Sequence, residues 1–184
     1  MKEIIDYIED KNILIRDDWF YHAMPFSKKN YTSALNNGIL SPYLLSCHNS
    51  SYRYVFVSRK NQNSKHSAFE NYSIYPNFII NNNIHGIKAT DSFIKKLFYG
   101  GYHGLRFTSL YDDEYQVYKK IGPEQIIGFL FNLEKLTNKY DKKYYFTMLC
   151  DLVVLLNELD LSLPIVDYYT SKEINKQKIL SLIK

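Results

Sequence analysis

A carboxylate, an imidazole and several tyrosines stand within or beside strand-like segments of this sequence. Glu114 precedes the alternating stretch YQVY, and His22 lies in the aromatic stretch WFYHA. A carboxylate can stabilise the positive charge of an oxocarbenium-like state and orient ribose hydroxyls, so Glu114 suits the breaking of a glycosidic bond. An imidazole can hydrogen-bond a ribose, and a tyrosine ring can stack on a flat heterocycle. His22, Tyr72 and Tyr54 are therefore candidate ligand contacts.

Other common catalytic and metal-binding patterns are missing from the sequence. The two cysteines, Cys47 and Cys150, are far apart and lack the CxxC spacing of zinc and redox sites. The remaining histidines show no HxxxH spacing, and no Walker loop, GxGxxG or GxSxG motif occurs. We therefore predict no metal site and no cysteine or serine nucleophile.

The candidate residues need strands and helices to position them, and hydrophobic periodicity indicates where these lie. Strands are predicted at 19–23, 52–58, 77–80, 115–118 and 126–131, because aromatic and β-branched residues dominate or alternate there. A helix is predicted over 28–36, with Ser27 as its N-cap and Gly38 as its C-terminal stop. Apolar residues three or four apart predict further helices at 2–11, 92–99 and 143–159, and a short helix is expected at 67–72.

Size and composition favour one globular domain. The chain has 184 residues, of which 46% are hydrophobic and 23% charged, so we expect a single domain spanning 1–184. Its core would cover about 19–131, and 143–184 would form a C-terminal helical part. The fold class expected from this mixture of elements is α+β.

Charge and hydropathy narrow the partners and the location. The net charge is +4, but the lysines and arginines do not gather into one stretch, so nucleic acid is a permitted partner without being indicated. No run approaches the roughly 20 apolar residues of a membrane span, and the acidic N-terminus does not read as a Sec signal. We expect a protein that does not enter membranes and that is cytoplasmic or is delivered into a host cell without a Sec signal.

Three segments together resemble the ADP-ribosyltransferases, in particular the branch that shares a His-Tyr-Glu pattern with diphtheria toxin and the poly-ADP-ribosylating enzymes. These segments are YHAMPFSKKNYTSALNNGIL at 21–40, YVFVSRKN at 54–61 with AFENY at 68–72, and DDEYQVYKKIGPEQIIGF at 112–129. His22 and Gly38 match the first motif of that family. Val57, Ser58, Ala68 and Tyr72 match the second, and Glu114, Val117, Pro123, Glu124, Ile126 and Ile127 match the third.

The resemblance implies a fold, a substrate and a set of roles. It implies a split sheet whose two small, mostly antiparallel parts form a cleft, flanked by helices, with NAD in the cleft. Glu114 would be the catalytic carboxylate, and His22, Ala23, Ser58, Tyr72 and Tyr54 would bind the dinucleotide. Glu114 and His22 would then face each other across one groove. Asp112 stands where members that modify arginine or asparagine often carry Glu or Gln, so the acceptor class stays open.

The activity implied by the resemblance is transfer of ADP-ribose to a macromolecule, with protein the first acceptor and nucleic acid the second, and with release of nicotinamide. A bacterial toxin or effector is a fitting setting. Two alternatives stay open. One is an RNA 2′-phosphotransferase, which also uses NAD but would grip phosphate with basic residues, for which Arg53, Arg59 and Arg106 are the nearby candidates. The other is a non-catalytic module that binds NAD or ADP-ribose on the same scaffold.

Overall fold

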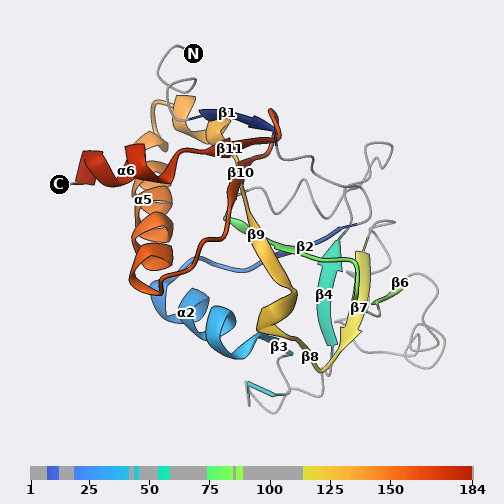
Figure 1. Cartoon of the computed structure of the whole chain (residues 1–184). Helices are drawn as coiled ribbons and strands as arrows, with labels where there is room; N and C mark the ends of the chain where they lie inside the picture. Colours follow the sequence, from blue (N-terminus) through green and yellow to red (C-terminus); the bar gives the residue numbers. More distant parts are fainter. Residues whose placement is uncertain are drawn as a thin grey trace.

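The computed structural model describes residues 8–12, 19–41, 44–45, 54–58, 74–84, 86–88 and 114–183. Over these residues the protein consists of helices and a mixed sheet, so its class is α+β, as the sequence predicts. The sheet has nine strands in the order β1-β11-β10-β9-β5-β2-β4-β7-β6 (Figure 1). A separate two-stranded sheet pairs β3 with β8.

The elements have the following bounds. The strands are β1 (Ile8–Asn12), β2 (Phe20–Ala23), β3 (Ile39–Leu40), β4 (Tyr54–Ser58), β5 (Asn77–Ile80), β6 (Gly86–Lys88), β7 (Glu114–Tyr118), β8 (Lys120–Ile121), β9 (Ile126–Phe131), β10 (Ile165–Asp167) and β11 (Lys172–Ile174). The helices are α2 (Lys28–Asn37), α5 (Lys142–Glu158) and α6 (Lys176–Ile183), with the 3-10 turns η2 (Pro123–Gln125) and η3 (Leu133–Thr137). Among the described strand pairs only β9 and β10 run parallel.

The strands at the middle of the sheet are continuous apolar runs. All four residues of β5 are buried, and β9 is buried at five of its six positions. A run of this kind is typical of a strand covered on both faces, because neither face can then carry polar residues. Accordingly one buried cluster, which includes Phe20, Phe78 and Phe129, lies on one face of the sheet, and a smaller one, Tyr21, Ile79, Leu130 and Val166, lies on the other.

Helix α2 begins and ends where the sequence predicts. The Ser27 hydroxyl accepts a hydrogen bond from the Asn30 N–H at 3.2 Å, which satisfies one of the free donors of the first turn. Gly38 has a φ of 86° and its N–H donates to the Ala34 carbonyl at 2.9 Å. The apolar face of α2, which consists of Tyr31, Ala34 and Leu35, is buried against the sheet.

Helix α5 supplies the largest helical share of the core. Eight of its residues are buried, and they recur at helical spacing from Tyr145 to Leu156. Figure 1 shows α5 and α2 on the same side of the sheet, with α6 beside α5. The Lys28 ammonium lies 2.6 Å from the Glu158 carboxylate and links the start of α2 to the end of α5. This exposed ion pair is worth at most about 1 kcal/mol, so apolar packing holds the helices in place.

Two expectations about the ends of the chain are wrong. Residues 8–12, predicted as part of a helix over 2–11, form strand β1, which pairs antiparallel with β11. The C-terminal part is not helical throughout, because β10 and β11 lie between α5 and α6. In both cases pairing with other strands overrides the local pattern, since strands this short carry little period-two signal.

The other predicted elements are confirmed where the structure describes them, and the helices predicted at 67–72 and 92–99 lie outside the described residues. Within the described ranges, no helix combines the length and the apolar character needed to cross a membrane.

Candidate functional site

The three segments that carry the family resemblance come to lie on three adjacent strands. They contribute β2, β4 and β7, and β4 is hydrogen-bonded between the other two. On one rung of the sheet Tyr21 pairs with Ser58, and Ser58 pairs with Glu114. The backbone of the predicted catalytic position is therefore held directly beside Ser58, although 55 residues separate the two strands' segments along the chain.

The junction between β2 and β4 lies at Tyr21 and Ser58. Tyr21 and Ser58 form the one register pair between these strands among the described residues, whereas β4 and β7 pair along all five positions. On the other side of β2, His22 and Ala23 are in register with Phe78 and Asn77 of β5. Among the described residues, β2 and β4 are thus joined at Tyr21 and Ser58, while β2 pairs with β5 along four positions and β4 with β7 along five.

An aromatic cluster holds the end of β2 to β5. The ring of half-buried His22 lies 6.5 Å from that of Phe78, which packs 4.6 Å from Tyr31 and 4.9 Å from Phe129. The Tyr31 hydroxyl donates to the Pro76 carbonyl at 2.6 Å, just before β5, and lies 3.3 Å from the Met24 carbonyl, just after β2. Burial raises the pKa of Tyr31, and the nearby Tyr75 raises it further, so this hydroxyl keeps its proton.

His22 and Ser58 lie on opposite faces of the sheet. Directly paired residues of antiparallel strands share a face, and successive residues alternate between faces. Tyr21, Ser58 and position 114 therefore belong to one face, and His22, next to Tyr21, belongs to the face of Phe20 and Phe78. The resemblance implies that Glu114 and His22 face each other across one groove. The backbone register instead assigns positions 22 and 114 to opposite faces of the sheet.

A ring contact fixes the strand that carries Glu114. Phe20 of β2 and Tyr115 of β7 meet edge to face, with ring centroids 5.1 Å apart and an interplanar angle of 77°. This contact spans β4 on the face of the larger core, on the side opposite Ser58. Because Tyr115 follows Glu114 directly, the contact and the Ser58 pairing together restrain the backbone at position 114.

The remaining predicted ligand contacts are distributed as follows. Ser58 is buried, with 4% of its surface exposed, and Ala23 is half-buried at the end of β2. Tyr54 begins β4, and its backbone pairs with Tyr118. Tyr72 lies outside the described residues. Of the predicted contacts, Ser58 and the backbone of Glu114 are therefore brought together, while His22 and Ala23 lie at the far side of the junction.

Sequence reasoning missed the residues that support His22. The sequence places Tyr31 on the buried face of a helix, but it does not connect this residue with Phe78 or Pro76. The hydrogen bond from Tyr31 to Pro76 joins residues that are 45 positions apart, and no local pattern predicts such a contact. The run NFII at 77–80 was the available signal for a buried strand, and this strand, β5, lies beside β2 in the sheet.

Metal and cysteine chemistry find little support in the part of the chain that the structure describes. No group of three or more potential ligands converges there. The thiol of buried Cys150 has a raised pKa, mainly because of burial, so it stays protonated and unreactive. The buried carboxylate of Asp167 is structural, since it accepts hydrogen bonds from the N–H groups of Leu133 and Thr170 at 3.1 and 2.9 Å.

Comparison of the chain with protein-family models, with curated proteins and with solved structures finds no match. A function is therefore inferred from the residues of the three motif segments and from their placement in the sheet.

Proposed function

We propose that this protein is an NAD-dependent ADP-ribosyltransferase, which transfers ADP-ribose from NAD to a macromolecular acceptor, most naturally a protein, and releases nicotinamide. Glu114 is the catalytic carboxylate of the proposal. His22, Ala23, Ser58, Tyr72 and Tyr54 contact the dinucleotide.

The observation that carries the proposal is the adjacency of β2, β4 and β7. Their segments are distant in sequence, and each bears one of the three motifs of the resemblance. Their positions along the chain do not by themselves make these three segments neighbours in the sheet.

The chemistry assigns a role to each side of the junction. The bond between the ribose C1′ and the nicotinamide nitrogen breaks, and a nucleophilic atom of the acceptor bonds to C1′ and loses its proton. Positive charge develops on the ribose in the transition state, and the Glu114 carboxylate stabilises it. Ser58, paired with Glu114 in the sheet, lies within the same region as a supporting hydroxyl. His22 and Ala23 bind the dinucleotide from the other side of the junction.

The decisive experiment compares transfer of label from NAD to proteins of a cell lysate by the parent chain and by Glu114→Gln. Loss of a charge-stabilising carboxylate should lower the rate at least about a hundredfold, which corresponds to about 2.7 kcal/mol. Glu134→Gln is the matched control, because Glu134 is exposed on η3, outside the three motif segments, and it should leave the rate within about twofold.

The outcomes separate the proposal from its alternatives. A change of less than threefold in Glu114→Gln would contradict the catalytic role. Binding of NAD without nicotinamide release, unchanged in that variant, would instead indicate a binding module. Activity on an RNA 2′-phosphate that is lost on substitution of Arg53, Arg59 or Arg106 by Ala would indicate a phosphotransferase.

A further inference from the structure

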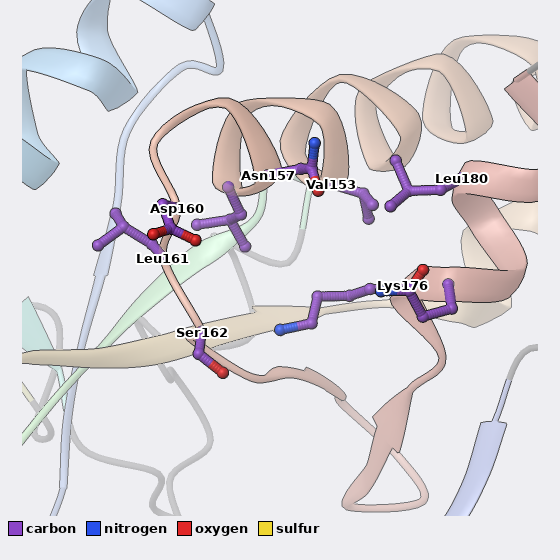
Figure 2. A pocket seen from close by; sticks show the side chains of 9 residues that line it. Val153, Asn157, Asp160, Leu161, Ser162, Lys176 and Leu180 are labelled. Atoms are coloured by element: carbon purple, nitrogen blue, oxygen red, sulfur yellow. The ribbon is translucent and has the colours of Figure 1, made fainter.

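A concave site at the C-terminal end of α5 includes no residue of β2, β4 or β7. It is a cavity of about 250 Å³ between the last turns of α5, the turn at 160–162 and the first two turns of α6 (Figure 2). Pockets for drug-sized ligands measure about 300 to 1,000 Å³, so this cavity suits a small molecule.

The cavity combines an apolar floor with a polar rim. Val153 and Leu156 of α5 are buried at its base, and Leu161 and Leu180 form partly buried walls. Asn157, Asp160, Ser162, Lys176 and Gln177 supply an amide, a carboxylate, a hydroxyl, an ammonium and a second amide around it. An apolar base with a few converging polar groups is the usual character of a small-molecule site.

Two opposite charges occupy this rim without pairing. The Lys176 ammonium donates one hydrogen bond, to the Leu163 carbonyl at 2.7 Å, and two of its three N–H donors remain. Figure 2 shows its side chain reaching from the start of α6 toward the turn at 160–162. Within the described part of the chain, the Asp160 carboxylate makes no hydrogen bond and no ion pair, with Lys176 or any other residue.

Asp160 lies at the left-handed position that ends α5, which Asp tolerates. It follows α5 directly with a φ of 53°, while its N–H donates to the Asn157 carbonyl and the Leu161 N–H donates to the Leu156 carbonyl, at 3.2 and 2.9 Å. This helix ending favours glycine or asparagine at the left-handed position. A negative charge there also faces the negative end of the helix dipole. The Asp160 carboxylate therefore gains no stabilisation from the end of α5, and a cationic group of a ligand would supply it with a partner.

We propose that this cavity binds a small zwitterion with an apolar side chain, of the α-amino-acid class. The ligand's ammonium meets Asp160, its carboxylate meets Lys176, and its apolar side chain lies against the partly exposed Leu161 and Leu180. Such a ligand supplies both missing partners at once, whereas a simple anion would leave Asp160 unpaired and would be repelled by it. This site is separate from β2, β4 and β7 and does not depend on the proposed transferase activity.

Isothermal titration of the full-length protein tests the proposal with three probes. L-leucine carries both charges, L-leucinamide lacks the carboxylate, and 4-methylpentanoate lacks the ammonium. We expect L-leucine to bind about five to ten times more tightly than either analogue, because each lost contact is a charge-assisted hydrogen bond at a partly exposed site.

Two variants assign each charge to its partner. Lys176→Met should reduce the affinity for L-leucine to that for L-leucinamide and leave the affinity for L-leucinamide within threefold. Asp160→Asn should do the same with respect to 4-methylpentanoate. Asp151→Asn on the exposed side of α5 and Lys178→Met on α6 are matched controls outside the cavity lining, and both should bind L-leucine as the parent does.

Failure of all twenty amino acids to bind at 10 mM, or equal losses for all three probes in Lys176→Met, would overturn the proposal. Thermal unfolding of each variant in the absence of ligand shows that the fold is intact.

Discussion

At the scale of single residues, Tyr31 has the most defined role. Its hydroxyl reaches the Pro76 carbonyl from within the core and so fastens the end of β2 to the start of β5 beneath His22. In Tyr31→Phe the ring packing is kept but a buried carbonyl loses its donor. We expect the free energy of unfolding to fall by about 1 to 3 kcal/mol. Urea denaturation measures this fall, with Tyr144→Phe, an exposed site, as the control.

The same residue gives a pH dependence of known sign. Burial raises the pKa of Tyr31 in the folded state above its unfolded value of about 10. Its contribution to stability is therefore complete below about pH 10 and is lost as pH rises toward the folded pKa. Above pH 10, unfolding free energy of the parent should decline more steeply than that of Tyr31→Phe, by about 1 kcal/mol per pH unit. Equal slopes would show that Tyr31 ionises as readily in the folded chain as in the unfolded one.

At the scale of the elements, the stop of α2 sets how the helix meets the small sheet. Gly38 combines a φ of 86° with a close approach, since an added Cβ would lie 2.2 Å from the Ile121 carbonyl oxygen. The strand β3 that follows it pairs with β8, so the two features fix the direction of the chain after the helix. The contact involves backbone, which cannot move aside as a flexible side chain can.

Gly38→Ala should therefore destabilise the protein by about 2 to 4 kcal/mol, since it adds left-handed backbone strain to a steric clash. The measurement is chemical denaturation, and Asn37→Ala, one residue earlier on the exposed side of α2, is the comparison. A loss of less than 1 kcal/mol in Gly38→Ala would mean that the turn relaxes around the new methyl group.

At the scale of the whole molecule, the sheet is assembled from both ends of the chain, and among the described residues Tyr21 and Ser58 join β2 to β4. β1 and β11 close one edge, and the strands of the candidate site lie toward the other. If NAD lies at the junction, its binding should slow amide hydrogen exchange in β2 and β4 and leave α6 unchanged. With free NAD at 100 times Kd, the slowing for amides that exchange by opening of the bound region should approach about a hundredfold. Glu114→Gln is the form to use, because it should bind NAD without consuming it.

Mass spectrometry of the exchanged protein locates the protection. Slowing in α6 and the end of α5 without slowing in β2 or β4 would indicate that the dinucleotide binds in the cavity between α5 and α6. It would thereby contradict both the placement of NAD and the separation of the two sites.

The sequence by itself determined most of the local structure. The Ser27 and Gly38 caps, the apolar face at Tyr31 and the alternation in 54–58 each depend on residues within a few positions of one another, so a single chain segment contains the information. The three motifs of the candidate site were also visible there, including Ser58 and Glu114 as separate positions.

Only the tertiary structure decided how these segments meet. Strand β1 forms because β11, more than 150 residues away, pairs with it. The rung that joins Tyr21, Ser58 and position 114, and the face on which His22 lies, depend on strand register, in which a shift of one residue exchanges the two faces. Register between distant strands is set by packing over the whole core, and no local stretch of sequence contains it.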